Sequence, residues 1–384
     1  MDVFIDALNS LGQGFLNLTW QSGIMISIGC LLLYLGIGRK IEPLLLIPIG
    51  FGVVLGNLPL ANLAAQDEGG VINLLYNTGI LTEIFPVLLF VGLGAMIDFG
   101  PLLANPIVLI FGAAGQFGIF ITLLLALGLG FAKQEAVSIA VIGACDGPTA
   151  IYVASKFARD LLPAVSIAAY SYMALVPIIQ PPIMRAMTTK KERAILMPPG
   201  EKHVSQRVKI LFPIIAGILT ILIAPMGAPL MGMLMLGNLL KESGVVSRLV
   251  DVSENTIANT VTLLLGLCIG ASMLGGNFLK WDTILVFLLG FIAIFMDTVT
   301  GMLLGKLIKV ISKGKINPLL GAAGTSAFPM SARVVQKEGQ KANPRSFLLW
   351  HAIGANAGGQ IGSVMAASVM LAVMSGLGIG PLGG

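Results

Sequence analysis

Charged side chains are scarce in this chain of 384 residues. Asp, Glu, Lys and Arg together make up 11% of it, whereas hydrophobic residues make up 56%. A soluble domain carries roughly 25% charged residues, so a chain of this composition cannot form an ordinary water-facing surface. The apolar segments are also too long and too continuous for the alternating strands of an outer-membrane barrel. The composition therefore predicts an all-α polytopic membrane protein.

Cysteine and histidine, common ligands of zinc, are few. Cys30, Cys145 and Cys268 lie in apolar segments without metal-ligand spacing, which favours buried packing. His203 and His351 have no zinc partner nearby in the sequence. No Walker A sequence is present, so the sequence does not support ATP hydrolysis by this chain. The net charge of +5 indicates membrane topology and not nucleic-acid binding.

The N-terminal segment lacks the positive charge of a cleavable signal, because Asp2 and Asp6 stand in that position. Apolar residues such as Phe4 and Leu8 fall near one face of a helix. Residues 1–19 are therefore expected to form an interfacial amphipathic helix.

Hydrophobic stretches long enough to span a membrane fall into two groups. We expect a first transmembrane repeat in residues 20–185, a cytoplasmic linker in residues 186–209 and a second transmembrane repeat in residues 210–384. Short motifs recur between the groups in the same order and at similar offsets. "LGN" around Gly56 recurs around Gly237, and "GACDGPTA" matches "GAAGTSAF". Because several weak matches agree in order, the sequence predicts an internal duplication.

The distribution of Lys and Arg decides between parallel and inverted repeats. Most of the 23 Lys and Arg residues fall on the side of the linker if each broken segment enters and leaves the membrane on one side. The positive-inside rule favours that arrangement. Each half then has about five spanning helices and one broken re-entrant helical hairpin, and the two repeats are inverted. The tips of the two hairpins are expected to meet.

The first broken segment reads "GACDGPTAIYVAS" and places Asp146 directly before Gly147 and Pro148. Pro148 removes an amide donor and Gly147 loosens the turn, so backbone carbonyls are freed. Irregular backbone at membrane depth is tolerated only where protein or a water-filled cavity covers it. Freed carbonyls and a carboxylate make a site suited to a small alkali cation or a proton. A simple kink with a capping aspartate is the alternative.

Further polar residues lie in apolar surroundings. Asn356, Gln360 and Ser363 have the spacing of one helical face, which suits neutral oxygen ligands of an ion or, alternatively, polar packing between helices. Asp98 and Asp297 are other acids in such segments, and a helix cap explains Asp98.

Three other residues have two interpretations each. Tyr170 and Tyr172 lie in "AAYSYMALVP", where a tyrosine is usually a packing residue or an interface anchor. Arg333 follows the second break and is either an anchor on the cytoplasmic side or a handle for an anionic substrate.

Four stretches carry a resemblance to a known family: "GACDGPTAIYVASKFA", "DFGPLLANP", "GQFGIF" and "NPLLGAAGTSAFPMSARVVQKEGQKANPRSFLLWHAIGANAGGQIGSV". In them the chain closely resembles the beta subunit of the sodium-ion-translocating, biotin-dependent decarboxylases. These membrane complexes act on oxaloacetate, methylmalonyl-CoA, glutaconyl-CoA or malonate. The resemblance covers nearly the whole chain. The chain length favours the methylmalonyl-CoA or glutaconyl-CoA branch.

The resemblance implies a primary sodium pump, a translocase of the bacterial cytoplasmic (inner) membrane. Such a subunit decarboxylates carboxybiotin, consumes a proton from outside and exports sodium ions. The implied cofactors are sodium and carboxybiotin delivered on a partner carrier subunit, with none covalently bound to this chain. The implied partners are the biotin carrier subunit, the carboxyltransferase alpha subunit and a small single-span gamma or delta subunit, and a homo-oligomer is expected. A secondary sodium-coupled symporter or antiporter with inverted repeats is the alternative.

The resemblance also implies roles for single residues. Asp146, Tyr172 and Arg333 are the implied catalytic residues, and Arg333 would bind carboxybiotin. Tyr172 would help to exchange the proton while alternating access moves the two hairpin tips. The implied sodium ligands are Asp146, Asn317, Gly321, Ser326, Asn356 and Ser363.

Overall fold

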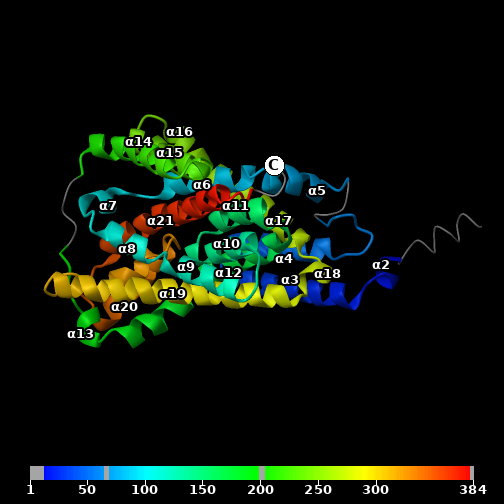
Figure 1. The fold of residues 1–384 in the computed structure, drawn as a ribbon, viewed down its shortest axis with the longest axis horizontal. Helices are drawn as coiled ribbons and strands as arrows, with labels where there is room; N and C mark the ends of the chain where they lie inside the picture. Colours follow the sequence, from blue (N-terminus) through cyan, green and yellow to red (C-terminus); the bar gives the residue numbers. More distant parts are fainter. Residues whose placement is uncertain (1–12, 65–68, 199–203, 381–384) are drawn as a thin grey trace, which may run out of the picture. The chain divides into compact units, whose positions relative to one another are not determined.

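The computed structural model describes residues 13–64, 69–198 and 204–380. The start of the predicted interfacial helix, residues 1–12, lies outside the described residues, and the remainder contains only the short helix α2 (Gln13–Leu16). His203 and residues 199–202 of the predicted linker also lie outside them. All regular elements among the described residues are helical, so the predicted all-α fold is confirmed (Figure 1).

The helical elements follow a similar order in both halves of the chain. The first half contains α3 (Trp20–Gly38), α4 (Pro43–Gly56), α5 (Val71–Leu75), η1 (Tyr76–Leu81), α6 (Ile84–Met96), α7 (Gly100–Ala104), α8 (Val108–Ala114), α9 (Phe117–Gly128), α10 (Lys133–Ala140), η2 (Val141–Ala144), α11 (Gly147–Phe157), η3 (Arg159–Leu161) and α12 (Leu162–Met187). The linker and second half contain α13 (Lys190–Arg193), α14 (Gln206–Ile223), η4 (Pro225–Gly227), α15 (Ala228–Ser243), α16 (Ser247–Asp251), η5 (Val252–Ile257), α17 (Ala258–Ser272), α18 (Gly275–Phe278), α19 (Trp281–Ile311), η6 (Pro318–Gly324), α20 (Met330–Ala342) and α21 (Leu349–Gly376).

One unusual series of elements occurs in both halves. A short helix, a π-helix and an apolar helix follow one another as α5, η1 and α6, and again as α16, η5 and α17. This recurrence agrees with the predicted duplication. The inverted orientation of the repeats and the domain boundaries stay predictions.

Seven helices of the described chain are long and apolar enough to cross a membrane. A bent pair, Val71–Leu81 and Ile84–Met96, meets at an angle of 61° and is an eighth candidate, while α4 is a shorter apolar helix. The multi-pass prediction is therefore confirmed. The number of crossings in each half stays a prediction.

The chain divides into two compact units, which are described separately. The first contains the residues up to Phe85 together with Asn259–Leu285, and the second contains Pro86–Ala258 together with Val286–Gly384. In the first unit α4 closely approaches α17, and a Cβ on Gly56 would lie 2.6 Å from the carbonyl oxygen of Ala271. In the second unit α15 approaches α6 in the same way through Gly237. Small residues at these positions allow the helices to pack at short distance.

An asparagine follows the glycine at both of these helix contacts. Asn57 Nδ2 donates a hydrogen bond of 2.8 Å to the carbonyl of Met273 in the first unit. Asn238 Nδ2 donates one of 3.1 Å to the carbonyl of Ile97 in the second unit. Each contact joins one half of the sequence to the other, so the repeated "LGN" motif makes reciprocal contacts.

Two sequence predictions have clear outcomes in the helices. Cys145 and Cys268 are buried as predicted, but the prediction was wrong for Cys30, which is exposed because its position on α3 points away from the buried side of that helix. Asp98 Oδ1 accepts a hydrogen bond of 2.8 Å from the backbone N–H of Gly100 at the start of α7. The N-cap residue of α7 is Phe99, so Asp98 bonds the first turn of the helix from the position before the cap, and the prediction that Asp98 is the N-cap itself was wrong.

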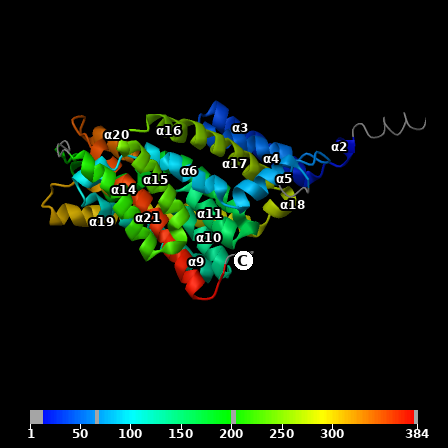
Figure 2. The same ribbon diagram turned by 90° about the horizontal axis from the view of Figure 1, so that it is seen from above.

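The second unit is built around α21. This helix packs against α8 and α20 (Figure 1), and also against η6. α15 packs against both α14 and α21 (Figure 2). Gly359 of α21 lies against the carbonyl of Gly324 in η6, where a Cβ would overlap the backbone. This close approach brings the polar residues of α21 beside the non-helical backbone that follows η6.

Candidate functional site

The first broken segment forms a turn between two helices. The 3₁₀-helix η2 ends before Cys145, which has a left-handed φ of 52°, and Asp146 is extended. α11 then begins at Gly147 with Pro148 in its first turn, where the missing amide donor breaks no helical hydrogen bond. Gly147 is required sterically, because a Cβ there would overlap the ring of Tyr170. The predicted break is therefore present at Asp146.

The carboxylate of Asp146 is enclosed by side-chain donors. Asp146 is 4% exposed, and its Oδ2 accepts hydrogen bonds from Thr149 Oγ1 at 2.6 Å and from Gln360 Nε2 at 2.7 Å. Ser363 Oγ lies 3.4 Å from the same oxygen, at the limit of a hydrogen bond. Hydrogen bonds to an ionised acceptor offset part of its desolvation cost. We refer to Asp146, Thr149, Gln360 and Ser363 as the Asp146 cluster.

The second broken segment contacts the first. η6 ends at Gly324, and a non-helical stretch leads from it to α20. In this stretch the Ser326 hydroxyl donates to the carbonyl of Ala144, the last residue of η2. Ala327 and Cys145 belong to one buried apolar cluster. The two breaks therefore meet, which confirms the prediction for the hairpin tips.

Three buried side-chain amides lie against the second break. Asn356, Gln180 and Gln116 each donate to a backbone carbonyl within residues 322–325. The amide oxygen of each has no hydrogen-bond partner among the described residues. Buried acceptors are satisfied in most proteins, so unpartnered oxygens beside one break need an explanation. Their lone pairs are free to satisfy a donor or a cation.

The two tyrosines of α12 have different surroundings. Tyr170 is buried against Gly147, and its hydroxyl has no hydrogen-bond partner in the described part of the chain. Tyr172 is half-buried, and its hydroxyl donates to the carbonyl of Phe287 on α19 at 2.6 Å. The predicted tyrosine is thus bonded to backbone, whereas Tyr170 is the one beside the Asp146 turn.

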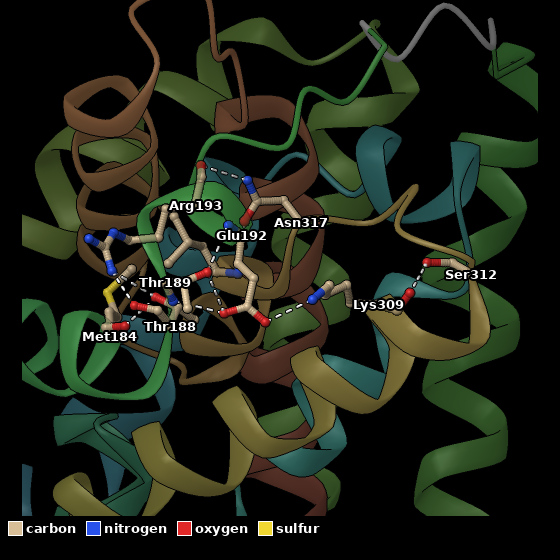
Figure 3. Close-up of polar contacts among 9 residues, drawn as sticks. Met184, Thr188, Thr189, Glu192, Arg193, Lys309, Ser312 and Asn317 are labelled. Atoms are coloured by element: carbon tan, nitrogen blue, oxygen red, sulfur yellow. Dashed lines mark hydrogen bonds and ion pairs between the residues drawn. The ribbon is translucent and has the colours of Figure 1, made fainter.

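Asn317 and Gly321 lie at the base of the second broken segment. Asn317 Nδ2 donates to the linker carbonyl of Arg193 at 3.0 Å (Figure 3). It also donates to the carbonyl of Ile195 at 2.9 Å. Its Oδ1 accepts from the backbone N–H of Leu319 at 3.0 Å. Gly321 packs against the backbone of α19 without room for a Cβ. The structure therefore places Asn317 on the linker and not in the Asp146 cluster.

Ion pairs connect the linker to α19 and the end of α12 to α20. Glu192 Oε1 accepts from Lys309 Nζ at 2.8 Å, and its other oxygen accepts from the backbone N–H of Thr189 at 2.8 Å (Figure 3). Burial acts to raise the pKa of Glu192, but the hydrogen bonds from Lys309 and Thr189 outweigh it and lower that pKa to about 2. Arg185 at the end of α12 donates two hydrogen bonds of 2.7 Å to Glu338 of α20. Arg185 thus ties the end of α12 to α20, and Glu192 ties the linker to α19.

Arg333 is exposed on α20. Within the described residues its side chain makes no hydrogen bond or ion pair. A guanidinium group can donate two parallel hydrogen bonds to one carboxylate. Arg333 is therefore free to contact an anionic group that approaches α20.

Sequence reasoning did not single out Thr149. A signal for it was present, because "DGPT" places a hydroxyl three positions after the residue that precedes a helix, which is the spacing of a helix cap. Gln180 had no comparable signal. Its contact with the second break at 2.9 Å depends on how α12 packs against η6, which spacing along one helix does not reveal.

Comparison with known sequences covers almost the entire chain. A family model described as Na+-transporting oxaloacetate decarboxylase beta subunit matches residues 21–374. This range contains both broken segments and every residue of the Asp146 cluster.

Three relatives are similar over nearly their full length. The methylmalonyl-CoA decarboxylase subunit beta of Veillonella parvula is 50% identical over 377 residues, covering 98% of this chain and 100% of the relative. The glutaconyl-CoA decarboxylase subunit beta of Acidaminococcus fermentans is 49% identical over 378 residues, with the same coverage of 98% and 100%. The oxaloacetate decarboxylase beta chain of Klebsiella pneumoniae is 45% identical over 428 residues, covering 96% and 99%.

Proposed function

The chain belongs to the family of Na+-transporting oxaloacetate decarboxylase beta subunits, and we propose that its Asp146 cluster binds the sodium ion that it transports. Members of this family couple decarboxylation to sodium transport within multi-subunit complexes, so the chain is a translocase subunit. It is a multi-pass protein of the bacterial inner membrane. The alternative of a secondary symporter is not favoured, since the relatives are decarboxylase subunits.

The observation that carries this proposal is the buried carboxylate of Asp146, surrounded by side chains that contain oxygen. The hydroxyls of Thr149 and Ser363 can rotate so that their lone pairs face a cation. The amide of Gln360 can present its oxygen in place of its nitrogen. One carboxylate with several neutral oxygens is the environment that hard cations prefer.

Two further oxygens support the proposal from the second break. Ser326 reaches the end of η2 directly before the Asp146 turn, and the amide oxygen of Asn356 is buried without a partner among the described residues. We propose that both join the Asp146 cluster around sodium. An ionised aspartate in the middle of a membrane costs roughly 2.5–3.5 kcal/mol, and a bound cation removes much of that cost.

Asn317 and Gly321 were predicted as sodium ligands, and that role stays a prediction. The contacts of Asn317 with the linker support a second role, in which it positions the base of the hairpin. We propose that Tyr172 and Tyr170 line the path of the proton. For Tyr172, this requires that its hydroxyl exchange the Phe287 carbonyl for another partner.

We propose that Arg333 binds the carboxylate of carboxybiotin presented by a biotin carrier subunit. Its exposed guanidinium supports this role, because a carboxylate can accept two hydrogen bonds from it. When carboxybiotin is decarboxylated, the bond between the ring nitrogen and the carboxyl carbon breaks and carbon dioxide leaves. The electron pair stays on the nitrogen, which takes up one proton. We propose that the complex also contains the carboxyltransferase alpha subunit and a small gamma or delta subunit. We further propose that this chain forms a homo-oligomer within the complex.

The proposed substrate of the complex is an acyl-CoA. The methylmalonyl-CoA and glutaconyl-CoA relatives align over 377 and 378 residues at 50% and 49% identity. The oxaloacetate relative aligns over 428 residues at 45% identity, so its alignment contains more inserted positions. Methylmalonyl-CoA and glutaconyl-CoA are therefore the substrates to test first.

The test of the sodium site is uptake of radioactive sodium into proteoliposomes that contain the complete complex. Addition of the acyl-CoA substrate should drive uptake, and Asp146→Asn should lower it by about tenfold or more, equivalent to at least ~1.4 kcal/mol of lost sodium binding. Asp282→Asn is the matched control, because Asp282 is an exposed acid at the start of α19. Full coupled uptake in Asp146→Asn would contradict the proposal.

A second measurement separates the pump from a symporter. Free carboxybiotin should be decarboxylated by the complex in a sodium-stimulated reaction, and Arg333→Ala should slow that reaction. A symporter would be indifferent to carboxybiotin. Unchanged turnover of carboxybiotin in Arg333→Ala would contradict the role of Arg333.

A further inference from the structure

Asp297 is a second acid enclosed within the transmembrane part of the chain. It lies on α19 and is 0% exposed. Its Oδ1 accepts a hydrogen bond from the backbone N–H of Gly118 at the start of α9. Its Oδ2 is buried and has no hydrogen-bond partner among the described residues. One oxygen of this carboxyl group is therefore unsatisfied in the structure.

Two glycines make room for the carboxyl group of Asp297. A Cβ on Gly118 would overlap Oδ1, and a Cβ on Gly143 would lie 3.2 Å from Oδ2. Gly143 belongs to η2, the element that leads into the Asp146 turn. The unsatisfied oxygen of Asp297 is thus covered by the first hairpin, a few residues before the proposed sodium site.

The two buried acids have chemically different surroundings. Asp146 is bonded to hydroxyl and amide side chains, all of which contain an oxygen that a cation can use. The carboxyl group of Asp297 has one hydrogen-bond partner among the described residues, the backbone N–H of Gly118. A backbone N–H cannot coordinate a cation, whereas each side-chain partner of Asp146 contains an oxygen that can. The hydrogen-bonded surroundings of Asp297 therefore suit sodium less well than those of Asp146.

No Lys or Arg of the described residues forms an ion pair with Asp297. The ion pairs among the described residues are made by Glu192, Glu242 and Glu338, and none of them includes Asp297. On the first hairpin, the Cys145 thiol lies within electrostatic reach of both Asp297 and Asp146. The hydrogen bond from α9 is donated by the backbone N–H of Gly118, an uncharged group. An ionised carboxylate would therefore be both desolvated and incompletely hydrogen-bonded.

We propose that Asp297 is a proton-binding site of this pump, separate from the sodium site at Asp146. This inference rests on the proposed function, in which one proton is consumed for each carboxyl group released. In the conformation described here the proton is held on the Asp297 carboxyl at Oδ2. When the first hairpin moves away from α19, Gly143 uncovers this oxygen, so that Asp297–COOH releases its proton as COO⁻ and later takes up another. In this arrangement Asp146 binds sodium and Asp297 binds the proton.

The test is infrared spectroscopy of the purified complete complex in the region of the protonated carboxyl stretch. We expect a band that shifts in heavy water, is present in Asp146→Asn and Asp282→Asn, and is absent in Asp297→Asn. In the unaltered complex, saturating sodium should leave this band in place, a measurement that needs no variant to fold. A band that persists in Asp297→Asn, or that sodium removes in the unaltered complex, overturns the proposal.

Sodium binding and turnover provide the second readout. Asp297→Asn should bind radioactive sodium with an affinity within about threefold of the unaltered complex, less than ~1 kcal/mol. Its substrate-driven turnover should fall and lose its dependence on pH. A loss of sodium binding in Asp297→Asn as severe as in Asp146→Asn would show that Asp297 is a sodium ligand. Unchanged turnover would show that its role is structural. Either result contradicts the proposal. The infrared band of the Asp297 carboxyl does not depend on sodium transport through Asp146. Failure of this proposal can therefore be distinguished from failure of the proposed function.

Discussion

Gln360 donates a hydrogen bond of 2.7 Å to Asp146, although the two residues lie 214 positions apart in the sequence. The bond links α21 to the turn that precedes α11. It joins a side chain from each half of the chain at the place where both helical hairpins are broken. Binding of sodium at Asp146 would therefore change side-chain contacts in both halves of the chain.

Gln360→Ala should weaken sodium binding. The variant removes one donor to the carboxylate and one potential oxygen ligand, so we expect sodium affinity to fall by about tenfold, or ~1.4 kcal/mol. The loss of a hydrogen bond to a charged group should also cost about 1.5–3 kcal/mol of stability. Both are measurable by titration with radioactive sodium and by thermal unfolding in detergent. Gln340→Ala, an exposed glutamine of α20, is the control and should change neither.

The two tyrosines of α12 should differ in their contribution to stability. Tyr172→Phe removes the hydrogen bond to Phe287, which should cost about 0.5–1.5 kcal/mol. Tyr170→Phe removes a buried hydroxyl that has no partner among the described residues, so the free energy of unfolding should stay equal or rise slightly. Thermal unfolding of the two variants side by side checks this order. A larger destabilisation by Tyr170→Phe would show that its hydroxyl has a partner.

The contribution of Glu192 to stability should depend on pH. Its pKa in the folded chain, about 2, lies below its ordinary value of 4.5 because of the hydrogen bonds from Lys309 and Thr189. The stabilisation is therefore complete above the ordinary value and is lost as the pH falls from there toward 2. At pH 7, Glu192→Gln should lower the free energy of unfolding by about 0.5–1 kcal/mol.

The measurement is thermal unfolding of the unaltered protein and of Glu192→Gln at a series of pH values. The difference between them should be constant near neutral pH and shrink in acid. Lys309→Met should give the same loss at pH 7, because it removes the same ion pair. A difference that grows as the pH falls would contradict the assigned cause.

Gly147→Ala should disturb the turn at Asp146. The added methyl group would overlap the ring of Tyr170, and forcing a methyl into packed surroundings costs roughly 1–3 kcal/mol. We also expect weaker sodium binding, because the Asp146 turn must shift. Gly128→Ala, at the end of α9, meets no atom within 4 Å and is the matched control. Equal stability and equal sodium affinity in Gly147→Ala would show that Tyr170 moves aside freely.

A large part of the site could be predicted from the sequence. An acid next to Gly147 and Pro148 in an apolar segment predicted both the break and the buried carboxylate. The spacing of Gln360 and Ser363 predicted one helical face, and both side chains do lie against Asp146. These predictions succeeded because helical periodicity and the effect of proline are local properties of the chain.

Other features of the site had no local signal. Tyr170 and Tyr172 are equivalent in the sequence, and the rotation of α12 decides which of them meets the Asp146 turn. Asn317 was assigned to sodium by resemblance, but its position at the base of the hairpin brings it to the linker carbonyls of Arg193 and Ile195. The unsatisfied oxygen of Asp297 likewise depends on how α9 and η2 pack against α19.

The sequence by itself determined that this chain is a helical membrane protein, where its helices break and which acid stands at the first break. Those properties follow from the composition and from residues adjacent along the chain, because hydrophobicity and backbone restrictions act locally. Only the tertiary structure decided which side chains contact one another and which buried oxygens lack a partner among the described residues. Such contacts join residues far apart in the sequence, and they depend on the rotation and closeness of packed helices, which no single segment encodes.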